Sequence, residues 1–314
     1  MADVQRITLS LRLQDVGGEV NIDPAVSDAG LLSSAQHLVL LIHGYNNSYK
    51  DAVDAYNGFH ARQKELDSAA RYGLGRTFVE VYWPGDADWG VASFLYYMGS
   101  IAHAKESAAV LAHYLLTQAG GARIDIVAHS MGCRVGLELL YALDTQQATL
   151  NIGRIVCMAG AVPTFMLVDA QPPRRLRPAY DRVLREGARS LYSGADMVLA
   201  AAFPAGQSLA AGEEGATPSA LGHAFWVDAS VPLNLGQAEN PGAGHSDYWG
   251  WNTKPQALQC AQHAAREVRG YLQFPSASSR EVGARTLLEA KAIEARELVQ
   301  QREIAEREAQ YRAP

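Results

Sequence analysis

Residues 123–140 read RIDIVAHSMGCRVGLELL, and this stretch decides the fold. An apolar segment of strand length runs directly into AHSMG at 128–132, and an amphipathic helical pattern begins at once. A serine flanked at a distance of two by small residues, on a sharp strand-to-helix turn, is typical of a nucleophile elbow. Ala128 stands where a glycine is usual, but it is still small. The stretch therefore predicts that Ser130 is lifted out of the end of a central strand.

Outside this stretch, apolar segments of strand length alternate with helical patterns. Short apolar strands separated by helices are typical of a mostly parallel sheet covered on both faces, so we expect the α/β class. The alternating segment at the start of the chain looks instead like one of a pair of antiparallel edge strands. The expected strands are 4–13, 37–42, 77–83, 123–127, 154–159, 190–192 and, less clearly, 223–231; the expected helices are 51–66, 101–118 and 133–143.

A serine becomes a good nucleophile only when a base removes its proton and a third group orients that base. After an elbow of this kind, the partners follow in the order acid, then histidine. His245 lies in the glycine-rich stretch GHSDYW at 244–249 near the end of the body, and it is the predicted base. His223 is the runner-up, although the apolar residues that follow it favour a buried strand.

The acid is predicted from the same chain order. Asp196 follows a short strand pattern and a turn that contains glycine, so we expect its carboxylate at the end of the sheet where Ser130 lies. Asp169 and Asp228 are the alternatives.

Acyl transfer also needs backbone N–H groups that bind the oxyanion. Met131, directly after the serine, supplies one of them. Residues 37–48 read HLVLLIHGYNNS, a strand followed by His-Gly, and Gly44 lets the backbone approach closely. Tyr45 N–H is therefore the second predicted donor, and we expect His43 to orient the loop.

Aromatic residues are frequent between positions 83 and 97. They follow a strand whose carboxyl end should face the same crevice as the serine. Trp83, Trp89 and Tyr97 are the candidates for the wall of an acyl or alkyl pocket.

Four blocks together resemble the α/β-hydrolase superfamily: HGYNNS at 43–48, WPG at 83–85, AHSMG at 128–132 and GHSDYW at 244–249. They look most like a bacterial branch of serine hydrolases that carries H-G-[FY]-N-N-S and has no settled substrate. The resemblance spans roughly residues 36–255. It implies an α/β-hydrolase fold and a triad of Ser130, Asp196 and His245.

These residues predict a serine hydrolase that cleaves a small-molecule carboxylic ester or thioester through an acyl-enzyme intermediate. An acyltransferase with the same triad is one alternative. A catalytically silent scaffold that acts through its C-terminal helix is another.

Composition excludes several other classes. The chain has 314 residues, 48% of them hydrophobic, and a net charge of −6, which disfavours nucleic acid as a partner. No zinc, phosphate-loop or dinucleotide motif is present, so neither metal nor cofactor is expected. Three widely spaced cysteines, no secretory leader pattern and no membrane-spanning stretch lead us to expect a cytoplasmic protein.

The charge divides the chain into two parts. Residues 279–314 hold seven Arg or Lys and seven Glu, so this tail is neutral and the body, 1–278, carries the whole net charge. The tail is expected to form one solvated helix with a possible role in self-association or partner docking. Within the body we expect a small cap at about 164–189 and a mobile loop at about 205–222.

Overall fold

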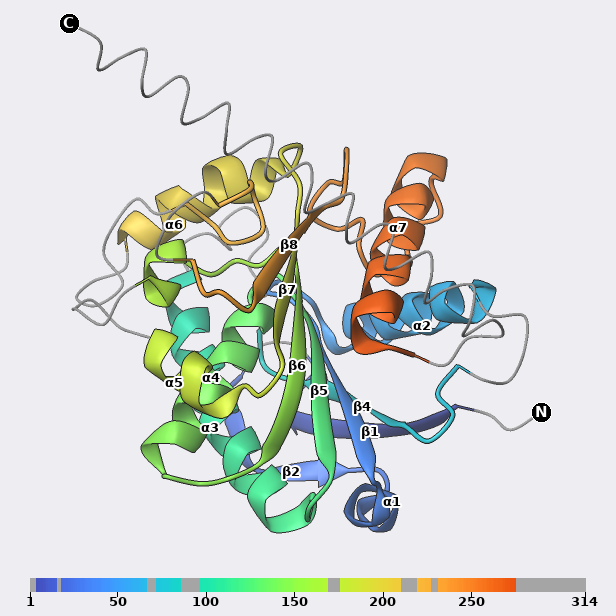
Figure 1. Ribbon diagram of the computed structural model, residues 1–314, viewed down its shortest axis with the longest axis vertical. Helices are drawn as coiled ribbons and strands as arrows, with labels where there is room; N and C mark the ends of the chain where they lie inside the picture. Colours follow the sequence, from blue (N-terminus) through green and yellow to red (C-terminus); the bar gives the residue numbers. More distant parts are fainter. Residues whose placement is uncertain are drawn as a thin grey trace, which may run out of the picture.

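The computed structural model describes residues 4–15, 18–66, 72–85, 97–168, 176–209, 219–226 and 231–274. These parts form one eight-stranded sheet with helices on both faces, and the predicted α/β class is confirmed (Figure 1). The strand order is β2-β1-β4-β3-β5-β6-β7-β8, antiparallel only between β1 and β2. The strands are β1 (Gln5–Arg12), β2 (Val20–Val26), β3 (His37–Ile42), β4 (Thr77–Tyr82), β5 (Arg123–His129), β6 (Asn151–Met158), β7 (Gly187–Tyr192) and β8 (Leu235–Glu239).

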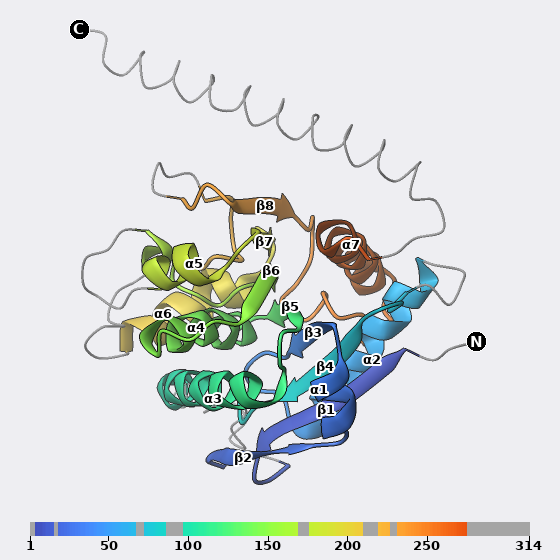
Figure 2. The same ribbon diagram turned by 60° about the horizontal axis from the view of Figure 1, so that its bottom comes forward.

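Helices cover the two faces of the sheet because the central strands are apolar on both sides. Figure 2 shows α3, α4 and α5 on one face and α2 and α7 on the other. None of the described helices is both long and apolar enough to cross a membrane. The helices are α1 (Ala29–Ser34), α2 (Tyr49–Glu65), α3 (Tyr97–Gln118), α4 (Gly132–Thr145), α5 (Arg177–Val183), α6 (Phe203–Leu209) and α7 (Pro255–Leu272), with a 3₁₀ turn at Thr164–Leu167 and a π-helical turn at Val198–Ala202.

The register of the sheet brings the ends of β3 and β5 together. Ile42, the last residue of β3, pairs with Ala128 near the end of β5. Because parallel strands end at the same edge of a sheet, the loops after β3, β5, β7 and β8 all leave from that edge. This edge is where the predicted site residues fall.

The first strand differs from its expectation in one respect. β1 is antiparallel to β2, as expected, but its other side pairs in parallel with β4. Of this antiparallel pair, only β2 therefore lies at an edge of the sheet, while β1 lies inside it.

The last strand was predicted at the wrong place. Residues 223–226 form a turn and an irregular segment, 227–230 lie outside the described residues, and the strand is β8 at 235–239. Gly222 is packed so tightly at the start of this segment that a Cβ on it would lie 2.1 Å from the backbone nitrogen of Gly160. The backbone N–H and C=O of Trp226 then pair with the side-chain amide of Gln237 instead of a neighbouring strand.

The described part of the expected cap connects β6 to β7 and includes α5, which lies in the helical layer. The helix α5 packs against α4, and its Arg182 forms an ion pair with Asp144 in the last turn of α4. Because α4 begins at the serine turn and runs away from it, α5 lies at the far end of that helix. Three expected segments lie wholly or partly outside the described residues: 169–175 of the cap, 210–218 of the loop, and the whole tail from 279. The first residues of the expected loop, 205–209, form the end of α6.

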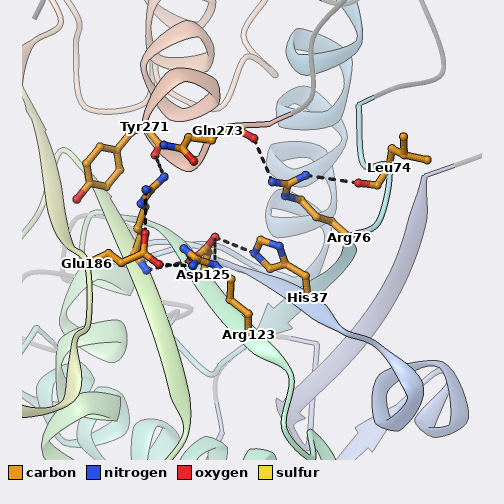
Figure 3. Close-up of polar contacts among 9 residues, drawn as sticks. His37, Leu74, Arg76, Arg123, Asp125, Glu186, Tyr271 and Gln273 are labelled. Atoms are coloured by element: carbon orange, nitrogen blue, oxygen red, sulfur yellow. Dashed lines mark hydrogen bonds and ion pairs between the residues drawn. The ribbon is translucent and has the colours of Figure 1, made fainter. Parts of the chain in front are cut away.

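A network of charged groups occupies the opposite edge of the sheet, where β3, β5 and β6 begin (Figure 3). Asp125 is fully buried; it contacts His37 Nε2 at 2.8 Å and accepts from Arg123 Nη2 at 3.0 Å and the backbone N–H of Arg154 at 2.9 Å. Glu186 pairs with both arginines. The network satisfies a carboxylate that would otherwise be costly to bury.

The same edge holds the end of α7. Arg154 Nη1 donates to the backbone oxygen of Tyr271 at 2.7 Å, and Arg76 Nη2 donates to that of Gln273 at 3.1 Å (Figure 3). Guanidinium groups at a helix C-terminus pair with carbonyls that have no partner inside the helix. The two arginines thus anchor the end of α7 to the sheet.

Candidate active site

Ser130 occupies a strained turn between β5 and α4. Its φ of +53° lies in the left-handed region, which non-glycine residues adopt at a cost of about 1–3 kcal/mol. Neighbouring backbone holds this conformation: Ser130 N–H donates to Met158 O at 2.9 Å, and Ser130 O accepts from Ala161 N at 3.1 Å. The turn has the backbone strain expected of the elbow.

Two glycines allow the serine turn to pack closely against the loop after β3: Gly132 at the start of α4, and Gly44 in that loop. A Cβ on Gly132 would lie 2.3 Å from the backbone oxygen of His43 and 2.5 Å from that of Ile42. A Cβ on Gly44 would lie 2.8 Å from the Cβ of Ser130. The start of α4, the serine and the loop after β3 are therefore in direct contact, and only hydrogen fits between them.

We expect a Gly132→Ala substitution to disrupt this contact, because the new methyl group meets main-chain atoms that cannot rotate away. The free energy of unfolding should fall by about 3 kcal/mol, and any reaction that depends on Ser130 should slow at least about 100-fold as the serine shifts. Urea unfolding and steady-state kinetics measure the two effects.

Gly136→Ala is the matched control on the same helix. Its Cβ would lie 3.5 Å from Ile126 Cγ2, an ordinary contact, and alanine favours a helix over glycine by about 1 kcal/mol. Equal losses of stability and rate in the two variants would contradict the packing argument.

The structure brings the three predicted residues Ser130, His245 and Asp196 together. His245 Nε2 lies 2.7 Å from Ser130 Oγ, and His245 Nδ1 lies 2.8 Å from Asp196 Oδ2. Since a carboxylate only accepts, Nδ1 carries the hydrogen and Nε2 is left to accept the serine proton. Asp196 is fully buried, Ser130 is 5% exposed, and the imidazole of His245 is 17% exposed.

Local structure fixes the acid in place. Asp196 follows β7, and its second carboxylate oxygen, Oδ1, accepts the backbone N–H groups of Val198 at 3.1 Å and Leu199 at 3.0 Å. These two N–H groups belong to the first residues of the π-helical turn that follows. One oxygen orients the histidine while the other is held by the backbone.

His245 lies in a tight turn after β8. Gly244 N–H donates to Asp247 Oδ2 at 2.9 Å, and Asp247 N–H donates back to Gly244 O at 3.1 Å, so His245 is carried on a closed turn. The runner-up His223 lies in another turn, partly exposed, with no hydrogen-bond partner for its buried Nδ1 in the described part of the chain. The alternative acids Asp169 and Asp228 lie outside the described residues.

The loop after β3 carries Tyr45, one of the two predicted oxyanion donors, next to Gly44 and hence beside the serine. Asn46, at a φ of +59°, donates its N–H to Gly85 O at 2.6 Å. Met131, the other predicted donor, caps the N-terminus of α4, where backbone N–H groups have no acceptor within the helix. Both backbone segments border Ser130.

His43 links this loop to Trp83, the residue directly after β4. It is fully buried, its Nδ1 lies 2.9 Å from Gly44 O, and its Nε2 accepts from the backbone N–H of Trp83 at 3.2 Å. The Trp83 indole stacks on it at 5.7 Å between ring centroids and donates to His43 O at 2.8 Å.

The predicted pocket residues fare differently. Trp83 is 0% exposed, and its indole stacks on His43. Trp89 lies outside the described residues. Tyr97 is the first residue of α3, and its side chain is likewise not described.

Sequence reasoning missed two side chains that border the site. Arg12, at the end of β1, donates through Nη2 to Asn47 O at 2.6 Å and so supports the loop after β3. No local pattern marked it, since it ends an alternating strand far away in the sequence. His129 precedes the serine in the quoted motif, and its Nε2 lies 2.7 Å from the backbone oxygen of His245.

Three buried imidazoles are held neutral. Burial lowers the pKa of His129 to about 3, and it lowers the pKa of His43 and His60 below the usual value. Because the unfolded chain binds protons at these sites below about pH 6.5 and the folded chain does not, the free energy of unfolding should decrease as the pH falls from 7 toward 5.

Two buried carboxyls extend this loss to lower pH. Burial opposes ionisation of Asp125 and Glu80, but hydrogen bonds from histidine and arginine outweigh it, and the pKa of each lies below its ordinary value. Their stabilisation is present above about pH 4 and is lost as the pH falls through the folded-state pKa. Urea midpoints measured from pH 7 to pH 3 test both steps, and midpoints that stay constant or rise on acidification would contradict the assignment.

The described residues include no cluster of three or more His, Cys, Asp or Glu side chains able to hold a metal ion.

Comparison with known proteins gives one family. Residues 27–165, less than half of the 314-residue chain, match the family described as "Alpha/beta hydrolase of unknown function (DUF900)". That span includes β3, the loop after it, β5 and Ser130. No curated protein matches the chain.

Solved structures with a similar arrangement are distant in sequence. A predicted CIB-like hydrolase from Thermoplasma acidophilum is 17% identical, with 76% of this chain and 87% of that chain covered and a TM-score of 0.40. The RedJ thioesterase from the prodiginine biosynthetic pathway in Streptomyces coelicolor is 13% identical (76% and 92% covered, TM-score 0.40). The esterase domain of a Rhodothermus marinus protein is 11% identical (78% and 92% covered, TM-score 0.38).

The sheet topology carries more weight than these likenesses, which say nothing about a substrate. Together with the family match, the mostly parallel eight-stranded sheet and its helical layers identify the chain as a protein with the α/β-hydrolase fold.

Proposed function

We propose that the protein is a serine hydrolase that cleaves a carboxylic ester or thioester through Ser130, His245 and Asp196. One observation carries the proposal: His245 lies between the other two at 2.7 and 2.8 Å, and the serine sits on a strained turn at a φ of +53°. This is the geometry in which a weak nucleophile is activated.

The first half of the reaction forms an acyl-enzyme. Ser130 Oγ attacks the substrate carbonyl carbon while His245 Nε2 takes the serine proton, and the carbonyl electron pair moves onto oxygen. The N–H groups of Tyr45 and Met131 bind this oxyanion, and losing one such donor typically costs about 100- to 1000-fold in rate. When the oxyanion collapses, the bond to the alcohol or thiol breaks, and the leaving group takes the proton from His245.

The second half releases the acid. Water attacks the acyl carbon, gives a proton to His245 and displaces Ser130 Oγ, which regains its proton. Asp196 keeps the Nδ1 hydrogen directed at its own carboxylate throughout and stabilises the imidazolium that forms in each half.

Covalent labelling tests the proposal. A fluorophosphonate probe should modify the protein once, and peptide mass mapping should place the adduct on Ser130. A p-nitrophenyl ester series from acetate to palmitate, with acyl-thioesters of matched length, should then give turnover and define the preferred chain length. Absence of labelling together with absence of turnover would overturn the proposal and favour a catalytically silent scaffold.

Product analysis separates hydrolysis from transfer. With added alcohols as competing acceptors, a hydrolase should still release mainly the free acid. Transfer ester as the main product would replace hydrolysis by acyl transfer at the same triad.

A further inference from the structure

The side chain that precedes the nucleophile contacts two other parts of the proposed machinery. His129 is the last residue of β5 and is 5% exposed. Its Nε2 lies 2.7 Å from the backbone oxygen of His245, and the two rings lie 5.2 Å apart between centroids. On another side, a Cβ built on Gly44 would lie 3.0 Å from His129 Nδ1.

The hydrogen bond fixes the tautomer of His129. A carbonyl oxygen only accepts, so Nε2 carries the hydrogen. The other ring nitrogen, Nδ1, is buried and has no hydrogen-bond partner in the described part of the chain. The ring is therefore a neutral donor that faces the base loop.

The proposed mechanism requires the His129 ring to be neutral. His245 becomes positively charged when it takes the serine proton, and a second cation at this distance in a buried site would oppose that step. Burial, with a contribution from His245 itself, keeps the pKa of His129 at about 3, so the ring stays uncharged over the working range of an imidazole base.

The contact also joins two elements whose separation sets the reacting distance. Ser130 is fixed to the end of β5, whereas His245 is carried on the turn at residues 244–247 after β8. The Nε2 to Oγ distance depends on how this turn sits against β5. Tyr248 and Trp249, the next buried rings, pack against the same His129 imidazole at 5.8 and 6.0 Å.

We propose that His129 is a positioning residue: its Nε2–H holds the backbone of His245 so that the base stays within hydrogen-bonding distance of Ser130. The role rests on the proposed function, because it has meaning only if His245 is the base. Loss of the donor releases the turn, and a misplacement of about 1 Å costs about 100-fold in rate.

Three substitutions isolate the donor. His129→Leu keeps bulk but removes both nitrogens, and His129→Asn keeps polarity with an amide too short to reach the carbonyl. His129→Gln places an amide N–H near the position of Nε2. The matched control is His60→Leu, which removes another buried neutral imidazole, 3% exposed, whose partners are Tyr72 and Glu80.

The readouts are the rate of fluorophosphonate labelling, kcat and KM on the best ester, and thermal unfolding. His129→Leu and His129→Asn should label and turn over about 10- to 100-fold more slowly, with KM unchanged within about twofold. His129→Gln should recover kcat to within about fivefold of the parent. His60→Leu should lose stability while the folded protein keeps its kcat.

Two results would overturn the positioning role: parent-like labelling in both His129→Leu and His129→Asn, or a His129→Gln variant that is folded yet as slow as they are. If His129→Leu does not fold, the Asn and Gln pair decides alone. Failure of the proposed function is distinguishable, since the parent protein itself would then neither label nor turn over.

Discussion

Replacing Ser130 by alanine should abolish turnover of the ester substrates while leaving the protein folded. The substitution removes the only atom of the triad that bonds to the acyl carbon, and the remaining donors and base cannot form an acyl-enzyme. We expect kcat to fall by about 10⁴- to 10⁶-fold, as when a triad nucleophile is lost. Steady-state kinetics and mass spectrometry of the fluorophosphonate-treated variant, which should carry no adduct, provide the measurement.

The exposed Ser33 of α1 provides the control, because its hydroxyl donates to Gly30 O within its own helix. Ser33→Ala should keep parent rates and full labelling. An adduct on the Ser130→Ala protein, or a kcat near that of the parent, would place the chemistry at another residue.

Asp196→Asn should have the second largest effect, again with little loss of fold. The amide oxygen can still accept the backbone N–H groups of Val198 and Leu199, which now bind Oδ1 at 3.1 and 3.0 Å. The amide nitrogen, however, donates, so it favours the His245 tautomer whose Nε2 carries the hydrogen and cannot accept from Ser130. We expect kcat to fall about 10⁴-fold with the geometry intact.

Asp144→Asn is the control for loss of a carboxylate. Asp144 lies in the last turn of α4, at the end of the helix away from Ser130, and it pairs with Arg182 of α5. Its replacement should therefore leave kcat unchanged. If Asp196→Asn kept more than a tenth of the parent kcat, another carboxylate would have to orient the base, and Asp169 and Asp228 would be the next to replace.

The sequence predicts the elbow well because the determinants are local. The apolar run of β5, the small residues around Ser130 and the amphipathic start of α4 occupy consecutive positions. Chain order then restricts the acid and the histidine to turns after later strands, and the structure places Asp196 and His245 in such turns. Their catalytic roles remain the proposal that the variants above test.

Features that depend on long-range packing were not predictable in this way. β8 reads LGQAE, with neither β-branched nor aromatic residues, so its sequence gives no strand signal, whereas the apolar residues after His223 do. The hydrogen bond between Trp83 and His43 joins residues 40 positions apart, and no local pattern predicts it. The hydrogen bond of His129 spans 116 positions, and nothing near the motif marks it.

The arginine anchor at the end of α7 also has a mechanical consequence. A pulling force applied to the chain after Phe274 would act first on the buried Phe274 ring, which packs on Tyr72 and Phe78. It would act next on the hydrogen bonds from Arg76 and Arg154 to the carbonyls at the end of the helix. These bonds lie at the edge of the sheet opposite Ser130, so the load would pass into the strands before it reached the turn that carries His245. Tethering the protein to a solid support through its C-terminus should therefore leave the spacing of the reacting groups undisturbed.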